Sequence, residues 1–329
     1  MASTVEKGLA LPPETIAAYR RDGAVLVKNL LSDQDLKRLE NGLEEAHNAP
    51  SQMFSRYTGG DDSGETFVDQ FPGERSADLR ILLEQGPCAE LAARLMGTPS
   101  AQLVLDQMFY KDAGQVLATP WHQDTPFLRV RGSQMARVWL PCDPSPAGVT
   151  LEVVRGSHLW NVVYDTSGRA SRSDLAKADE GDAFSYDGVG EDNLPPLPDI
   201  DAHRDSFDII SWDVEPGDAV VFDGNILHGA SGRANHPRKR RAYPCMFGGP
   251  DLQYQGEMAQ GMPLPDNSDA STVPHGARIG DHPDVFPVVW REANWLPASK
   301  AQTNAPWQCL YLLPEPQGHG ELRLISISA

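Results

Sequence analysis

The sequence has 329 residues, with 46 Asp and Glu against 28 Lys and Arg, so its formal net charge is −18 at pH 7. Hydrophobic residues make up 40% and charged residues 22% of the chain, which is ordinary for a soluble globular protein with a large core. The acidic balance argues against nucleic-acid binding, since no basic stripe exists to release counterions. No apolar run is long enough to span a bilayer, so we expect no membrane partner either.

The first fifteen residues carry no apolar segment of the kind found in secretory signals. The four cysteines are widely scattered and form no CxxC pair. A disulfide framework is not expected in a chain of this size, and reduced thiols are the default. We therefore expect a cytoplasmic protein.

Residues 1–99 are expected to form a mostly helical N-terminal part. Apolar residues at helical spacing, Pro and Gly punctuation and a capping box support this expectation. The predicted elements are a helix opened by Pro12 and stopped by Gly23, a buried strand at 24–27, a helix capped by Ser32 and Asp35, and a helix over 77–96.

From residue 100 to residue 250 the pattern changes to short apolar runs separated by Gly, Pro, Asp and Asn. Such a pattern predicts an antiparallel sandwich or barrel rather than parallel βαβ units, because no regular helical pattern lies between the runs. The predicted strands are 101–110, 136–140, 149–154, 219–222 and 241–247.

Two regions depart from this core pattern. Residues 161–208 are rich in Asp, Gly, Ser and Pro, and an insertion this long predicts either a functional lid or a solvated surface loop. Residues 251–329 are Pro-rich and irregular, with one more apolar stretch at 285–290. We expect one domain over 1–329, because no internal repeat or linker divides it.

Two separate stretches contain candidate metal ligands. In Thr119–Thr125, His122 and Asp124 stand two residues apart, so on a strand their side chains would share one face. By itself this triplet is far more typical of a polar turn or strand end, because such triplets often arise by chance. His228 follows an apolar strand and a turn, and alone it could be a buried core histidine.

A third stretch, 238–242, places arginines at the start of an apolar strand, where a solvated charge cluster is the simpler interpretation. Taken together, two imidazoles and one carboxylate match the facial triad of non-haem Fe(II) oxygenases, which leaves coordination positions open for 2-oxoglutarate and O₂. The far carboxylate of 2-oxoglutarate then needs a cation, and the planar fork of an arginine suits it. Arg240 lies one turn and one return strand beyond His228.

The ordered set of motifs resembles the phytanoyl-CoA dioxygenase family of Fe(II)/2-oxoglutarate-dependent oxygenases. The resemblance covers most of the chain and is carried by these stretches: Tyr19–Val27, Asp106–Lys111, Thr119–Asp124, Val138–Leu140, Gly156–His158, His228–Gly229 and Arg240–Ala242. It implies a mainly β fold with flanking helices, the double-stranded β-helix or cupin-like jelly roll.

The resemblance also implies roles for individual residues: His122, Asp124 and His228 would bind iron, and Arg240 would hold the distal carboxylate of 2-oxoglutarate. Arg241 is the alternative, because neighbouring strand residues face opposite ways and the spacing from His228 is one residue longer than in many relatives. The family often lines its cosubstrate pocket at the positions of Gln107, Thr119 and Trp139. It often has a hydroxyl residue where this chain has Ala230.

The function expected from this resemblance is a dioxygenase that uses Fe(II), 2-oxoglutarate and O₂. It would hydroxylate or otherwise oxidise a small organic substrate, such as a secondary metabolite, and release succinate. The carboxylate of Asp124 favours hydroxylation, because halogenating relatives have Gly or Ala there. The alternative is a non-catalytic cupin-like module that binds a metal or small molecule, although such a module would not need the arginine. The substrate and the oligomeric state stay open.

Overall fold

The structure is a computed structural model that describes residues 9–58, 64–114, 118–165, 194–230, 237–256, 264 and 270–293. All described residues belong to one compact unit, Met1–Ala293. The remainder of the irregular C-terminal part, 294–329, lies outside the described residues. The expectation of a single domain over the whole chain therefore stays a prediction.

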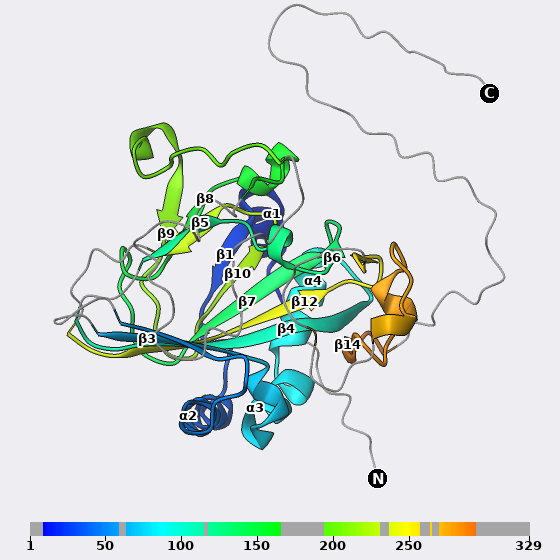
Figure 1. Cartoon of the computed structure of the whole chain (residues 1–329), viewed down its shortest axis with the longest axis horizontal. Coiled ribbons are helices and arrows are strands. Elements are labelled where there is room, and N and C mark those ends of the chain that lie inside the picture. The colour runs from blue at the N-terminus through cyan, green and yellow to red at the C-terminus, as the bar shows by residue number, and fades with distance from the viewer. Residues whose placement is uncertain are drawn as a thin grey trace, which may run out of the picture. The chain divides into compact units, whose positions relative to one another are not determined.

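The larger sheet places strands that are distant in the sequence side by side, in the order β1-β10-β7-β12-β4-β3-β2, and β14 also pairs with β4 (Figure 1). Its neighbouring strands are all antiparallel. Its strands are β1 (Ala24–Val27), β2 (Ser55–Thr58), β3 (Glu65–Gln70), β4 (Ser100–Lys111), β7 (Met135–Pro141), β10 (Ala219–Asp223), β12 (Arg240–Gly248) and β14 (Val288–Arg291).

A smaller antiparallel sheet has the order β5-β11-β8-β9. Its strands are β5 (Thr119–His122), β8 (Leu151–Val154), β9 (Ile209–Ser211) and β11 (His228–Ala230), and a separate pair joins β6 (Val130–Arg131) to β13 (Gln253–Tyr254). Residues of the larger sheet and of the smaller sheet line one cavity between them. This mainly antiparallel architecture confirms the predicted jelly roll with flanking helices.

Side-chain alternation along the strands separates a packed face of the larger sheet from a cavity face. On β7, Val138 and Leu140 join the hydrophobic core that also contains Leu91 and Leu95 of helix α4 (Cys88–Met96). The alternate residues Arg137 and Trp139 border the cavity.

Four α-helices occur in the described part of the chain, all before residue 100: α1 (Pro13–Asp22), α2 (Asp33–Asn48), α3 (Ala77–Gln85) and α4 (Cys88–Met96). The predicted ends of the first two are confirmed. Gly23 closes α1 in the left-handed region at φ 78°, which glycine adopts without strain. The Ser32 side chain caps α2 by accepting a hydrogen bond from the Asp35 backbone N–H. No described helix has the length and apolar character needed to cross a membrane.

The prediction of one helix over 77–96 is wrong. Two helices replace it, and they break at Gly86 and Pro87. Proline has no backbone N–H to donate and disfavours helical geometry in the residue before it, so an uninterrupted helix through Pro87 is costly. The N-terminal part also contributes β2 and β3, two strands that the sequence pattern did not predict. The short single-turn helices are η1 (Pro72–Glu74), η2 (Thr125–Phe127), η3 (Ser157–Trp160), η4 (Arg204–Ser206), η5 (Ala270–Thr272) and η6 (Ile279–Asp281).

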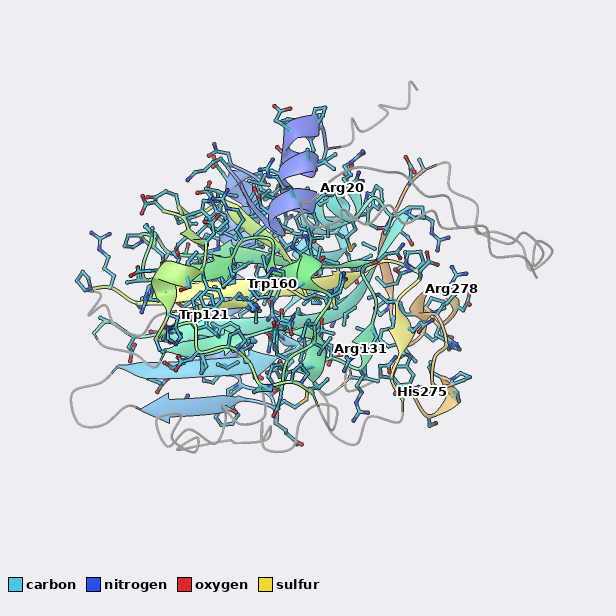
Figure 2. The ribbon with its side chains drawn as sticks, turned by 90° about the horizontal axis from the view of Figure 1, so that it is seen from above. Arg20, Trp121, Arg131, Trp160, His275 and Arg278 are labelled. Carbon is cyan, nitrogen blue, oxygen red and sulfur yellow. The ribbon has the colours of Figure 1, made fainter. Side chains whose placement is uncertain are left out.

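The expected lid insertion, 161–208, is described only at its two flanks, since 166–193 lie outside the described residues. The second flank is attached to the smaller sheet. Asp201 accepts a hydrogen bond from the Trp121 indole at 3.2 Å, and Arg204 pairs with Glu152 of β8 at 2.6 Å. Trp121 is labelled in Figure 2. The lid function itself stays a prediction.

Candidate metal centre and cavity

The three predicted ligands meet where β5 and β11 pair. His122 is the last residue of β5, Asp124 follows two residues later, and His228 is the first residue of β11. His122 and His228 are direct partners in the sheet register, and their ring centroids are 4.1 Å apart. A strand pairing between distant parts of the sequence therefore builds the site.

The two imidazoles turn the same nitrogen toward the same carboxylate oxygen. Nε2 of His122 lies 3.6 Å from Oδ1 of Asp124, and Nε2 of His228 lies 3.7 Å from it. The other ring nitrogen of each histidine is within hydrogen-bond distance of a backbone carbonyl, Pro120 O at 2.7 Å and Ile226 O at 3.1 Å. A carbonyl contact of this kind fixes the tautomer that presents Nε2 to a metal.

The charge states at the centre also suit a cation. Burial and the neighbouring His122 lower the pKa of His228 to about 3, so its imidazole is neutral near pH 7 and keeps a lone pair for a metal. Burial by itself would raise the pKa of Asp124. Arg137, His228 and His122 outweigh that effect and hold the pKa well below its usual range, so the carboxylate stays ionised.

The second oxygen of Asp124 has a partner that the sequence did not identify. Arg137 Nη1 donates to Asp124 Oδ2 at 2.9 Å, and Nη2 donates to Oε1 of Gln107. Gln107 Nε2 donates in turn to Gln70 Oε1 at 2.7 Å. One buried chain of hydrogen bonds thus connects β3, β4 and β7 to the metal centre.

The two candidate cosubstrate arginines face different surroundings. Arg241 donates to Asp143 at 2.9 and 3.0 Å and to Glu44 at 2.6 Å, and the Asp143 hydrogen bond raises its pKa. Arg240 donates from Nη1 to the Val149 carbonyl at 2.8 Å, while its buried Nε and Nη2 have no hydrogen-bond partner. Both residues border the cavity, but only the guanidinium of Arg240 keeps donors for an anion.

Lys111 adds a second cation beside Arg240. The two residues are directly opposite each other on β4 and β12, and Lys111 Nζ lies 3.3 Å from the Thr119 hydroxyl. Burial and the charge of Arg240 lower the pKa of Lys111 to about 8. Lys111 was not among the predicted site residues, because its position opposite Arg240 depends on the strand register.

The cavity that holds these groups has a volume of about 250 Å³. The predicted residues Gln107, Thr119 and Trp139 all border it, together with His122, Asp124, His228 and Arg240. Most of the remaining lining is apolar, including Val68, Leu105, Phe109, Phe127, Leu128 and Phe222. A mostly apolar cavity with a few convergent polar groups is typical of a small-molecule site.

Gln123, between two of the ligands, points away from the centre and holds neighbouring segments. Its Nε2 donates to the carbonyls of Val162 at 2.9 Å and Asn225 at 2.7 Å, and its Oε1 accepts from Tyr164 N at 2.9 Å. The first flank of the long insertion is therefore attached to the loop that carries His122 and Asp124.

Arg131, another cation near the metal strand, supports the backbone rather than the cavity. Its Nη1 donates to the carbonyls of Thr125 and Leu128 at 2.5 and 2.8 Å, across η2. Arg131 and Arg278, both labelled in Figure 2, pair with Gln253 of β13 from its two sides. The contacts of Arg131 therefore stabilise the backbone around η2.

The residues present fit an iron ion and a keto-diacid. The donor set of two neutral imidazoles and one carboxylate, with ligand atoms all within 4.8 Å of one another, is the facial triad of non-haem iron proteins. The buried, unpartnered nitrogens of Arg240 in the same cavity suit a carboxylate.

A family model described as phytanoyl-CoA dioxygenase matches residues 19–242. The chain belongs to this family. Members of the phytanoyl-CoA dioxygenase family use Fe(II), 2-oxoglutarate and O₂, and the His122–Asp124–His228 cluster could bind the metal. The protein is accordingly an Fe(II)/2-oxoglutarate-dependent oxygenase, as the sequence resemblance implied.

Solved structures share the fold of this family member at low sequence identity. The carbocyclase SnoK from nogalamycin biosynthesis superposes with a TM-score of 0.60 at 17% identity, covering 85% of this chain and 97% of SnoK. The epimerase SnoN, in complex with Fe³⁺, α-ketoglutarate and nogalamycin RO, gives 0.61 at 17% identity, covering 84% and 98%. EctD from S. alaskensis, with 2-oxoglutarate and 5-hydroxyectoine, gives 0.52 at 16% identity, covering 74% and 78%. No curated protein sequence matches the chain.

Proposed function

We propose that this oxygenase hydroxylates, or otherwise oxidises, a small organic molecule and couples that oxidation to the conversion of 2-oxoglutarate into succinate. The observation that carries the proposal is the presence, in one cavity, of the His122–Asp124–His228 cluster and the unpartnered guanidinium nitrogens of Arg240. A protein that only binds a metal needs the first feature and has no use for the second.

In this proposal His122, Asp124 and His228 hold Fe(II), and Arg240 pairs with the distal carboxylate of 2-oxoglutarate. Iron with its bound cosubstrate supplies the oxidising chemistry, which protein side chains lack. Asp124 fills a coordination position that a halide would need, which favours hydroxylation over halogenation.

Lys111 and Thr119 are placed to assist Arg240. The lysine is directly opposite the arginine on the neighbouring strand, and the threonine hydroxyl lies beside the lysine. A dianionic keto-acid would meet two cations at one end of the cavity. We also assign Trp139 to the cosubstrate wall, because it borders the same cavity. The amide of Gln107 is already engaged by Arg137 and Gln70, so we assign it an indirect role.

The substrate in this proposal is a small, mainly apolar organic molecule. Two observations support this choice of substrate. The cavity lining is mostly apolar, and the similar structures of SnoN and EctD contain bound small organic molecules. Low polarity around the reacting carbon excludes water and directs the oxidation to the substrate. The three described cysteines are free thiols, in keeping with the cytoplasmic location that we propose.

Succinate release tests the function directly. The purified protein is incubated with Fe(II), ascorbate, 2-oxoglutarate and a panel of small organic molecules, and succinate and oxidised products are quantified by mass spectrometry. We expect one class of substrate to stimulate succinate formation and to gain oxygen or lose hydrogen. Tight binding of Fe(II) and 2-oxoglutarate without any stimulated turnover would instead support the binding module.

A further inference from the structure

The carboxylate of Asp124 is held by an arginine. Arg137 Nη1 contacts Oδ2 of Asp124 at 2.9 Å, while Oδ1 alone faces the Nε2 atoms of His122 and His228. The side chains of Arg137 and Asp124 are only 8% and 6% exposed. The two carboxylate oxygens are thus divided between a protein cation and the candidate metal position.

The guanidinium is itself held in place. An arginine fork commonly grips both oxygens of one carboxylate, but this fork spans two residues, since Nη2 donates to Gln107. Gln107 is fixed by Gln70, and both glutamines are 3% exposed. Because its two terminal nitrogens contact different residues, Arg137 is kept from rotating to bind both oxygens of Asp124.

Charge pairing explains why the buried Asp124 carboxylate has a cationic partner, but it does not explain why that partner contacts only one of its two oxygens. A buried guanidinium beside a metal carboxylate repels the incoming cation, and burying charges costs free energy unless they are paired and hydrogen-bonded. The hydrogen bonds run outward from the guanidinium: Arg137 donates to Asp124 on one side and to Gln107 on the other, and Gln107 donates in turn to Gln70. The benefit that remains is orientation of the carboxylate.

We propose that Arg137, locked by Gln107 and Gln70, is a positioning residue that makes Asp124 a ligand through a single oxygen, Oδ1. This inference rests on the proposed function, because it assumes that the cluster binds a metal. A carboxylate held in this way occupies one coordination position instead of two and leaves room for a bidentate keto-acid and a further ligand. The same contact also gives the buried carboxylate an oppositely charged partner.

The test uses the purified full-length protein and Mn²⁺ as a redox-stable probe, with binding followed by calorimetry and by electron paramagnetic resonance. Arg137→Met removes the contact at similar side-chain volume, and Arg137→Lys keeps the charge without the fork. Loss of a group that orients a metal ligand typically weakens metal binding about 10- to 100-fold, so we expect that range for Arg137→Met. We expect partial recovery in Arg137→Lys, and a resonance signal that differs from wild type in both variants.

Lys28→Met is the matched control. Lys28 pairs with Asp218 at 2.8 Å, the Asp218 side chain is 3% exposed, and neither residue borders the cavity. This variant also removes a cation from a buried carboxylate, so it reports general destabilisation. We expect it to bind Mn²⁺ as wild type does, even if its melting temperature falls.

Gln107→Leu keeps the inference falsifiable if Arg137→Met does not fold. It frees the second arm of Arg137 without leaving a buried charge unpaired, and we expect a smaller but measurable loss of Mn²⁺ affinity. If Arg137→Met folds, a Mn²⁺ affinity equal to that of the wild type would overturn the inference. If Arg137→Met does not fold, the same result in Gln107→Leu would overturn it. A loss of 2-oxoglutarate affinity with Mn²⁺ affinity intact would also overturn it, because Arg137 would then serve the cosubstrate. Absence of Mn²⁺ binding in the wild type would refute the proposed function itself.

Discussion

Lys111 and Arg240 lie directly opposite each other on β4 and β12, so two cations share one end of the cavity. Like charges at directly opposed sheet positions destabilise a strand pair. The structure reflects this conflict, because burial and Arg240 lower the pKa of Lys111 to about 8. A carboxylate bound near both side chains would relieve the repulsion.

This pairing predicts a pH dependence for cosubstrate binding. Lys111 loses its charge as the pH rises through about 8, so the affinity for 2-oxoglutarate should begin to fall above that pH. Folding responds in the opposite direction. Because the folded-state pKa lies below the ordinary 10.5, protonated Lys111 opposes folding fully below pH 8, and this penalty disappears as the pH approaches 10.5.

Calorimetric titration of 2-oxoglutarate into the Mn²⁺-loaded protein would measure the change in cosubstrate affinity. The titrations should run from about pH 6.5 to about pH 10, a range that brackets the ionisation of Lys111. Lys111→Met should bind more weakly at pH 7 and lose the additional decline above pH 8. A wild-type profile in that variant would show that another group titrates.

The two neighbouring arginines should separate binding from stability. Arg240→Met should weaken 2-oxoglutarate binding by about 2–5 kcal/mol, or about thirtyfold or more, because a buried charge-assisted contact is lost. Arg241→Met should leave binding nearly unchanged. It should lower the free energy of unfolding by about 2 kcal/mol, since the contacts to Asp143 and Glu44 are lost. The reverse outcome in titration and urea denaturation would assign the cosubstrate to Arg241.

The ligand cluster should be indispensable for turnover and dispensable for the fold. We expect His122→Ala and Asp124→Asn to abolish substrate-dependent succinate formation, because each removes one metal donor. Asparagine keeps an oxygen that can accept from Arg137, so the buried guanidinium retains a partner. Circular dichroism should show an unchanged fold. Full turnover in either variant would contradict the assignment of the ligands.

A remote helix cap provides a prediction about stability alone. Ser32 Oγ accepts from Asp35 N at 3.2 Å and donates to Asp35 Oδ2 at 2.7 Å at the start of α2. Ser32→Ala should therefore lower the free energy of unfolding by about 1 kcal/mol. Ser32→Asp, which keeps a capping oxygen, should lose less, and neither change should affect succinate formation.

The strands of the core could be predicted because strands that are buried on one or both faces have apolar runs, and turn residues separate these runs. Among the strands that the sequence did not predict, β2 and β3 lack that pattern. Asp69, on β3, is fully buried and is satisfied by Ser51 and Arg75. A buried carboxylate of this kind looks like a surface residue in the sequence, since its partners lie on other elements.

The clustering of His122, Asp124 and His228 could be predicted, because the chemistry of a metal site needs few residue types at recognisable positions. Arg137 and Lys111 could not be assigned in the same way. Each acquires its role from a neighbour on another strand or loop, Asp124 for one and Arg240 for the other. The sequence around Arg137 gives no sign that Asp124 is its partner, because the two residues are 13 positions apart and meet only in the folded protein.

Pairing of His122 with His228 has a consequence for biosynthesis of the protein. During synthesis the first histidine and Asp124 leave the ribosome well before the second histidine exists. The three-donor site can therefore assemble only after the chain has been made past β11 and this non-local strand pair has closed, which is a slow kind of folding event. With iron held as in the proposed function, loading would be deferred to a nearly finished fold, so that a half-made chain would not carry a complete redox-active centre.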